Sequence, residues 1–222
     1  MAWDEMISNF TDERAAIVST AREIDRLGLV SGSSGNVSLR LNQEGLMAIT
    51  PMGVPYSQLT EGDVVVVDSE LEPVEGELAP SSESLLHVGI YGRRKDIGAV
   101  IHTHSIFSSV AAVTGQEIPP IIDEMVVYVG GEIRVSQYAF PGTVALAENV
   151  CSALQDRSAA LIRNHGAVGV GHTIKEALRV CMLIERVAQI YVYASITGSI
   201  SELPADVVKR EQAIYSMRMG AN

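Results

Sequence analysis

The sequence predicts an α/β fold of three layers, in which helices cover both faces of a mixed, largely antiparallel central sheet. Segments with helical periodicity alternate with short apolar runs of strand length along the 222-residue chain. Several neighbouring strand-like runs are separated only by turn-length segments, which favours antiparallel pairing. Neither a repeat nor a low-complexity linker divides the chain, so residues 1–222 are expected to form a single domain.

The first half of the chain is expected to begin with a helix and continue with strands. Residues 11–29, TDERAAIVSTAREIDRLGL, place acidic residues in a first turn and apolar residues on one face before Gly28. A turn and three short strands follow within 31–40, 46–50 and 63–68, and the run DVVVVD is apolar enough to be buried on both faces. The next helix is expected to begin at Pro80, with Ser81 or Ser82 as its N-cap.

In the second half, residues 99–104 predict a buried strand and residues 105–115 a helix. MVVYV at 125–129 and EIRVSQY at 132–138 predict two strands joined through a hairpin at Gly130-Gly131. A helix is expected over 143–157, and then a strand, a turn and a strand over 159–171. Thr173 is expected to cap a long helix that ends near Ile196, and a last helix is expected from Pro204 to about Met217.

The composition excludes some classes of partner. The net charge of −11 argues against a nucleic-acid surface, because neutralising phosphates requires clustered Lys and Arg. The first ten residues, MAWDEMISNF, do not have the pattern of a secretory signal. The two cysteines, Cys151 and Cys181, lie among apolar residues and are expected to be small buried hydrophobes of a protein in the reducing cytoplasm.

The most apolar long stretch, Ala177–Ile196, has the length of a membrane span. It carries Arg179, Glu185 and Arg186, which are costly to place in lipid. We therefore expect a buried core helix and no membrane partner.

Two histidines one residue apart, in the stretch AVIHTHS at 99–105, raise the question of a metal site. In a strand, His102 and His104 point to the same face and present both imidazoles where the strand ends, although two core residues would give the same pattern. His165 lies in a predicted turn between two apolar runs and can supply a third ligand. Glu83 can complete the set, or it can be an ordinary acidic residue in a first helical turn.

The Gly- and Ser-rich segment 31–36 lacks the spacing of a nucleotide-binding loop and can be a simple turn. Alternatively, Gly35 and Asn36 can combine with Ser81 and Ser82 to offer amide, hydroxyl and backbone N–H donors. Such donors suit one phosphate group without any Arg.

Five motifs follow one another along the chain: GNVSLR at 35–40, ITPMGVPYSQL at 49–59, PSSE at 80–83, AVIHTHS at 99–105 and RNHGAVGVG at 163–171. Together they resemble the class II aldolase/adducin family, and most closely its L-fuculose-1-phosphate aldolase-like branch. The resemblance extends from the first helix to about Ile196. It implies the three-layer fold of that family.

The resemblance also implies a catalytic divalent ion, Zn²⁺ or another metal such as Mn²⁺ or Co²⁺, held by His102, His104, His165 and Glu83. In the family the glutamate leaves the metal when substrate chelates it and becomes the general acid/base. Phosphate recognition is implied for Gly35, Asn36, Gly53, Ser81 and Ser82. Met52 departs from the family pattern, because the hydroxyl that precedes this glycine in the family is missing here.

The activity that the resemblance implies is reversible cleavage of a ketose 1-phosphate to dihydroxyacetone phosphate and an aldehyde. Fuculose 1-phosphate and deoxy- or methylthio-ribulose 1-phosphates are the expected kinds of substrate. The group that protonates the aldehyde part stays open, because Glu124, Tyr128 and Tyr215 each match the family's tyrosines poorly.

Other activities share this fold. Sugar-phosphate 4-epimerases of this fold have an Asp at the position that corresponds to Glu83, whereas this chain has the Glu of the aldolase motif. Dehydratases and decarboxylases of this fold also form an enediolate intermediate. The adducin head is a non-catalytic module, which is expected to lack the full set of metal ligands. The family resemblance further implies a homotetramer with active sites between neighbouring subunits.

Overall fold

The computed structural model describes residues 10–220. The prediction that the first ten residues are not a secretory signal concerns a segment almost wholly outside the described residues. The helices are α1 (Thr11–Arg26), α2 (Ser84–Arg93), α3 (Ile106–Thr114), α4 (Asp123–Val129), α5 (Val144–Leu154), α6 (Ile174–Thr197) and α7 (Ala205–Arg218), with a 3₁₀ turn at Glu61–Asp63. The strands are β1 (Asn36–Arg40), β2 (Met47–Ile49), β3 (Val65–Val67), β4 (Pro73–Glu75), β5 (Ala99–Thr103), β6 (Arg134–Val135), β7 (Ala159–Ile162) and β8 (Gly166–Gly171).

The strands form one eight-stranded sheet in the order β4-β3-β2-β1-β5-β8-β7-β6. Every neighbouring pair is antiparallel except β6 and β7, which are parallel. The central strand β5 therefore pairs with β1 on one side and with β8 on the other. This confirms the predicted mixed, largely antiparallel sheet.

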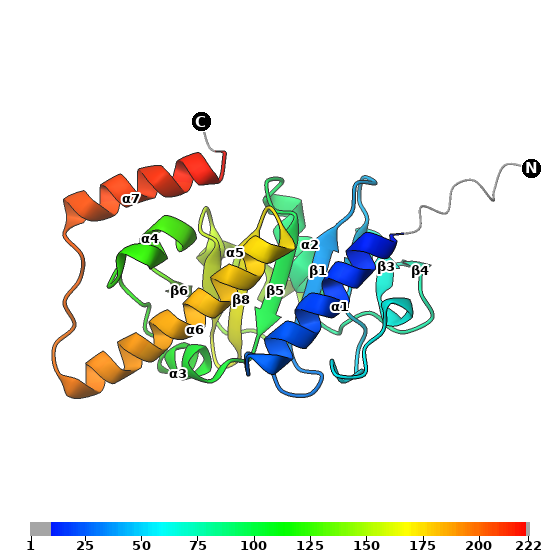
Figure 1. The fold of residues 1–222 in the computed structure, drawn as a ribbon, viewed down its shortest axis with the longest axis horizontal. Coiled ribbons are helices and arrows are strands. Elements are labelled where there is room, and N and C mark those ends of the chain that lie inside the picture. Colours follow the sequence, from blue (N-terminus) through cyan, green and yellow to red (C-terminus); the bar gives the residue numbers. More distant parts are fainter. Residues whose placement is uncertain (1–9, 221–222) are drawn as a thin grey trace, which may run out of the picture.

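Helices cover both faces of the sheet, as the fold prediction requires. In Figure 1, α1 and α6 cross in front of the strands, while α2 and α5 lie behind them. Alternation along the strands separates the two cores, because Val37 and Ile101 face α1 and α6, whereas Val100 and Val168 face α2 and α5. A third apolar cluster joins α3, α4 and α6 over β7 and β8. The molecule is therefore a three-layer αβα structure.

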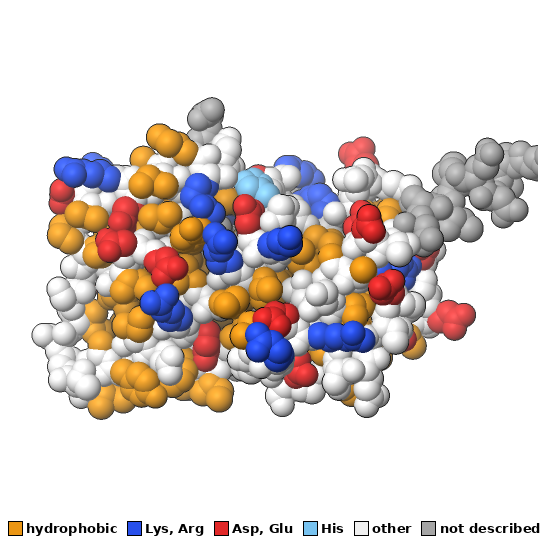
Figure 2. Space-filling model, in the orientation of Figure 1, with side chains coloured by type: hydrophobic (Ala, Val, Ile, Leu, Met, Phe, Trp, Pro, Cys, Tyr) orange, Lys and Arg blue, Asp and Glu red, His pale blue; other side chains and the backbone are white. Residues whose placement is uncertain are grey.

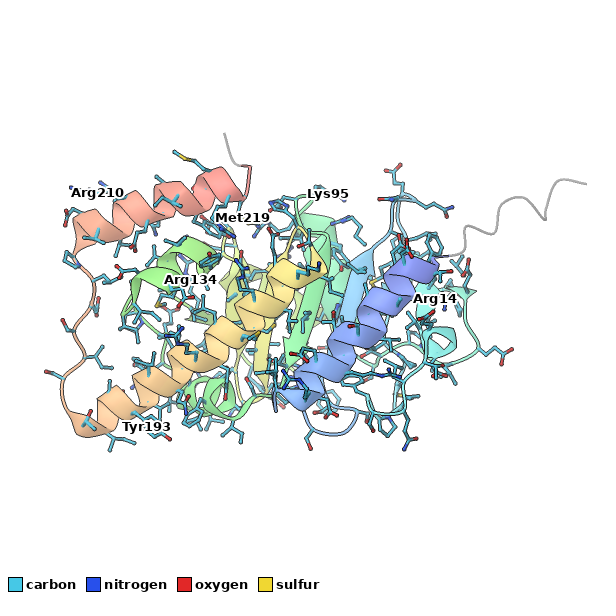
Figure 3. All side chains as sticks on the ribbon, viewed as in Figure 1. Arg14, Lys95, Arg134, Tyr193, Arg210 and Met219 are labelled. Atoms are coloured by element: carbon cyan, nitrogen blue, oxygen red, sulfur yellow. The ribbon has the colours of Figure 1, made fainter. Side chains whose placement is uncertain are left out.

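Helix α6 is long and apolar enough to cross a membrane by length and composition alone. Its inner face instead packs against the sheet, and Glu185 accepts hydrogen bonds from the backbone N–H groups of Phe107 and Ser108 at the start of α3. Near the C-terminal end of α6, the ring of Tyr193 (Figure 3) contacts the ring of Phe107 edge to face. The prediction of a core helix fits these contacts.

The prediction of a strand at 125–129 and of a hairpin after it was wrong. MVVYV belongs to helix α4, whose buried residues Met125, Val126 and Val129 follow helical spacing, and Gly130 ends it in a left-handed conformation. No hairpin therefore forms at Gly130-Gly131, and only Arg134–Val135 of the following segment is a strand. The strand β4, which Arg14 (Figure 3) links to α1 through Glu75 at 2.8 Å, was not predicted.

The start of α2 also differs from the expectation. The helix begins at Ser84, so neither Ser81 nor Ser82 is its N-cap, and Glu83 occupies the cap position without bonding the helix backbone through its side chain. Ser81 Oγ instead accepts a hydrogen bond from the Glu83 backbone N–H at 3.3 Å. The Glu83 carboxylate is therefore free to point elsewhere.

The face shown in Figure 2 intersperses basic with acidic side chains over hydrophobic ones. On this face the basic side chains do not form a continuous stripe.

Candidate metal centre

The ends of three elements bring the four predicted ligands together. His102 lies in β5 and His104 directly after it, His165 lies in the turn between β7 and β8, and Glu83 directly precedes α2. Because β5 pairs with β8, the β7–β8 turn comes to the end of β5 where the two histidines project.

A glycine allows β8 to approach β5 closely at this point. A Cβ on Gly166 would lie 2.2 Å from the Thr103 carbonyl oxygen and 3.4 Å from His102 Cε1. Just before it, Asn164 adopts a left-handed conformation with φ of 57°, which Asn tolerates better than most residues. The NHG sequence thus forms the tight turn that places His165 beside the other histidines.

The four side chains converge on one point. Their candidate ligand atoms all lie within 4.8 Å of one another. His102 Nε2 lies 2.8 Å from His104 Nε2 and 3.0 Å from Glu83 Oε2, and the three imidazole rings have centroids 4.7 to 4.8 Å apart. Glu83 Oε1 lies 3.5 Å from His165 Nε2.

The donor set fits a divalent ion. His102 Nδ1 donates to the Ala167 carbonyl oxygen at 2.9 Å, which leaves the lone pair on Nε2 directed at the cluster. Among the described residues, Glu83 Oε1 and His165 Nδ1 are buried without a hydrogen-bond partner. Three imidazoles and one carboxylate match the ligands that zinc takes in catalytic sites. The cluster is therefore able to hold a metal.

Electrostatics keep these groups in the forms that ligate metals. Burial opposes the charge on Glu83, but its hydrogen bond with His102 and the nearby histidines outweigh burial and lower the pKa to about 2. Burial lowers the pKa of His104 to about 4, helped by His102 and His165, and also lowers the pKa of His165. At neutral pH the carboxylate is ionised, and His104 and His165 are neutral.

Beside the cluster lies a cleft of about 350 Å³, which Glu83, His104 and His165 line from one side. All five residues that the sequence analysis assigned to a phosphate also line it, namely Gly35, Asn36, Gly53, Ser81 and Ser82. Gly35 has φ of 74°, and a Cβ there would lie 2.6 Å from the His102 carbonyl oxygen. The glycine is therefore required for the close packing of this wall against β5.

Comparison with known proteins identifies the family. The family described as "Class II Aldolase and Adducin N-terminal domain" matches residues 15–192. The chain belongs to this family.

Among relatives of this class II aldolase/adducin protein, 5-methylthioribulose-1-phosphate/5-deoxyribulose-1-phosphate aldolase of Rhodospirillum rubrum is 36% identical over 197 residues, which cover 89% of this chain and 88% of the relative. L-fuculose phosphate aldolase of Escherichia coli (strain K12) is 38% identical over 175 residues, 79% of this chain and 80% of the relative. A solved structure of L-fuculose 1-phosphate aldolase superposes with a TM-score of 0.89 at 32% identity, over 93% of this chain and 97% of that one. The fold and the family branch predicted from the sequence are confirmed.

The three residues left open for aldehyde protonation lie outside the cleft of this class II aldolase/adducin chain. Glu124 pairs with Arg186 at 3.0 Å. The Arg218 guanidinium lies over the Tyr128 ring, 4.2 Å from its centroid, and the Tyr215 hydroxyl hydrogen-bonds Ser158 Oγ. Both contacts lie near Val170 and Gly171, at the end of β8 that is far from His165. Within one chain, none of the three reaches the metal cluster.

Two features of the site were missed in the sequence. Asn36 Nδ2 donates to Glu83 Oε2 at 3.4 Å, a contact that depends on the pairing of Asn36 with His102 across β1 and β5. On its other side, His104 borders a shallow apolar hollow lined by Ile106, Val110 and Val113 of α3. The helical i, i+4, i+7 spacing of these three apolar residues was the available signal for the hollow.

Proposed function

We propose that this protein is a metal-dependent aldolase that reversibly cleaves a ketose 1-phosphate with an apolar tail into dihydroxyacetone phosphate and an aldehyde. The prediction of a ketose 1-phosphate aldolase is confirmed at that level by the named relatives and by the family match. The single observation that carries the site assignment is the convergence of Glu83 and three histidines at the mouth of a cleft rich in phosphate-type donors.

The resident metal is proposed to be Zn²⁺, with Mn²⁺ or Co²⁺ as substitutes, held by His102, His104, His165 and Glu83. When bound, such an ion supplies Lewis-acid stabilisation of the negative charge that develops on the enediolate oxygens. The buried Glu83 Oε1, which has no hydrogen-bond partner, supports this assignment.

Glu83 is proposed to be the acid/base of the reaction. In the direction of synthesis, its ionised carboxylate takes a proton from the carbon next to the carbonyl of dihydroxyacetone phosphate, leaving an enediolate. In the direction of cleavage, the ionised Glu83 carboxylate takes the proton of the hydroxyl on the carbon that becomes the aldehyde. The bond from that carbon to the dihydroxyacetone phosphate part then breaks, its electron pair stays on that part as the enediolate, and Glu83 gives the proton to the enediolate carbon. The absence of a helix-capping bond from its side chain supports a carboxylate that is available for proton transfer.

The phosphate is proposed to lie in the cleft, against the hydroxyls of Ser81 and Ser82 and the Asn36 amide. Gly35 and Gly53 allow backbone N–H groups to approach it, and both have the positive φ that glycine tolerates. Because Met52 has no hydroxyl group, the Met52-Gly53 pair is proposed to bind the phosphate through backbone N–H groups alone.

The aldehyde tail is proposed to lie against the apolar hollow of α3. His104 borders both the cleft and this hollow, so a substrate with its phosphate in the cleft extends its far end toward Ile106, Val110 and Val113. Aliphatic walls favour a 5-deoxy or 5-methylthio end over a hydroxylated one. The name of the Rhodospirillum rubrum relative supports this choice.

The whole chain, residues 1–222, is proposed to act as one domain in a cytoplasmic homotetramer with active sites between subunits. Large apolar side chains beside the site support an interface there, since Phe140 next to Pro141 of the cleft is 73% exposed and Ile106 is 69% exposed. Light scattering at micromolar concentration should give the mass of four chains, and a monomer mass would contradict the proposal.

The activity is tested by following release of dihydroxyacetone phosphate with a coupled dehydrogenase. Fuculose, rhamnulose, ribulose, 5-deoxyribulose and 5-methylthioribulose 1-phosphates are compared on metal-replete protein. We expect release from the last two at the highest kcat/KM. No release from any of them, with metal bound, would overturn the aldolase proposal in favour of epimerisation, dehydration or decarboxylation, whereas protein that binds no metal would indicate an adducin-like module.

A further inference from the structure

A buried chain of hydrogen-bonding side chains leads from Tyr91 to the carboxylate of Glu83. The Tyr91 hydroxyl lies 2.8 Å from Ser38 Oγ, which lies 2.6 Å from His87 Nδ1. On the other side of the imidazole, His87 Nε2 contacts Asn36 Oδ1. Asn36 Nδ2 then reaches Glu83 Oε2 at 3.4 Å.

Water has little access to this chain. His87 and Ser38 are fully buried, and Asn36 is 2% exposed. Burial lowers the pKa of His87 to about 3, with a smaller effect of His102, so its imidazole is neutral at pH 7. A buried donor that faces a donor, or an acceptor that faces an acceptor, is costly, so every contact in the chain must match.

The orientation of the Asn36 amide fixes the direction of every bond. Its NH₂ group faces Glu83 Oε2, and its carbonyl oxygen faces His87 Nε2. An acceptor at that place requires a proton on His87 Nε2. The neutral ring then accepts at Nδ1, so Ser38 donates to His87 and Tyr91 donates to Ser38.

We propose that His87 is a positioning residue that holds the Asn36 side-chain amide with its NH₂ group toward Glu83 and the phosphate cleft. This inference rests on the proposed function, in which Asn36 contacts the phosphate. One N–H of the amide bonds Glu83, and the second is available to a phosphate oxygen in the cleft that Asn36 lines.

The opposite orientation of the amide would be harmful. It would turn Asn36 Oδ1 toward the Glu83 carboxylate and toward the phosphate, so that acceptors face acceptors at both places. Only the donor at His87 Nε2 distinguishes the two orientations from the far side of the amide. Without it, the amide has no fixed orientation before substrate binds.

The tautomer of His87 is the first test. ¹⁵N NMR of zinc-loaded, histidine-labelled protein reports which nitrogen carries the proton, and the resonances missing from His87→Gln belong to this residue. We expect neutral imidazole with the proton on Nε2. A proton on Nδ1, or a charged ring at pH 7, would overturn the proposal whether or not the protein is an aldolase.

A double-mutant cycle is the second test. His87→Leu, Asn36→Ala and the double variant are compared in kcat/KM and in affinity for inorganic phosphate by calorimetry. His87→Leu alone should lower both by at least about tenfold, the range of a lost hydrogen bond to a charged group. In the Asn36→Ala background it should cause no further loss, because the amide that it holds is gone.

Two further variants separate positioning from folding. His87→Gln retains a donor toward Asn36 and should recover most of the activity. Ser158→Ala loses a buried hydrogen bond to Tyr215 away from the site, so it should lower thermal stability without changing either constant. If the losses caused by His87→Leu and Asn36→Ala in kcat/KM and in phosphate affinity simply add in the double variant, His87 does not act through Asn36 and the proposal is overturned. If wild-type protein cleaves no ketose phosphate, the proposed function fails, while the tautomer still decides the inference.

Discussion

Replacing His87 by Gln should change how the stability of the protein depends on pH. The wild-type imidazole is buried and neutral, with its pKa lowered by burial from about 6.5 to about 3. In the unfolded chain it regains its ordinary pKa. Between these values the unfolded state binds one more proton than the folded state, so stability falls as the pH falls. Well above pH 6.5 neither state is charged at this residue, and its full contribution is present.

The size of the effect follows from the unfolded pKa alone, because the folded pKa lies far below the range tested. From pH 7 to pH 5, the free energy of protonating one unfolded histidine with a pKa near 6.5 changes by about 2 kcal/mol. Glutamine does not titrate. Wild-type protein should therefore lose about 2 kcal/mol more free energy of unfolding than His87→Gln over this interval.

The assay is urea unfolding of both proteins at pH 7, 6 and 5 after removal of metal by a chelator. Glu83 and His102, the charged or titratable groups that act on His87, are present in both proteins and largely cancel in the comparison. Equal losses of stability in wild type and variant would refute the reasoning, because they would mean that the imidazole is already protonated in the fold or remains accessible to protons.

Three further predictions concern the site. Glu83→Gln should retain metal on the three histidines, as measured by elemental analysis, but lower kcat by about 10² to 10⁴, the usual contribution of a general base, and cleavage at the wild-type rate would exclude Glu83 as the acid/base. Gly166→Ala places a Cβ 2.2 Å from the Thr103 carbonyl oxygen and should lower zinc affinity, and it should lower the free energy of unfolding in urea by about 1–3 kcal/mol or more. The control Gly92→Ala, at an exposed position in α2 with open space around it, should raise the free energy of unfolding by up to about 1 kcal/mol. Equal urea midpoints for the two variants would contradict this prediction. Val110→Asn should reduce kcat/KM for 5-methylthioribulose 1-phosphate about tenfold without a similar loss for ribulose 1-phosphate, and a uniform loss would argue against the apolar hollow as the tail site.

Much of the fold follows from patterns within single elements. Thr173 caps α6 and forms a capping box with Glu176, and the 3.6-residue apolar period identifies α1 and α5 without tertiary information. The strand β4 escaped prediction because it is an exposed edge strand that begins with a proline.

Helix α4 shows where local propensity misleads. The run MVVYV is rich in β-branched residues, which favour strands. The structure forms a helix because Met125, Val126 and Val129 pack as one face in the cluster shared with α3 and α6. Their helical spacing was visible in the sequence, but a five-residue apolar run does not distinguish the two periods.

The candidate site divides in a similar way. The three histidines were candidates because His102 and His104 lie one residue apart at the end of a predicted strand and His165 lies in a predicted turn. The family resemblance, not a local pattern, implied the complete ligand set with Glu83. The bond between Asn36 and Glu83, and the contact of His87 with Asn36, join residues 47 and 51 positions apart, and they depend on how β1, β5 and α2 pack. No local pattern encodes that arrangement.

The proposed cleavage depends on a metal held by Glu83 and the three histidines. The most direct measurement is release of dihydroxyacetone phosphate from 5-deoxyribulose 1-phosphate by metal-replete protein, by chelated protein and by chelated protein to which Zn²⁺ is returned. Release should be lost on chelation, restored by zinc, and absent in a His102→Ala, His104→Ala variant. Release that persists from protein shown by elemental analysis to hold no metal would contradict the account.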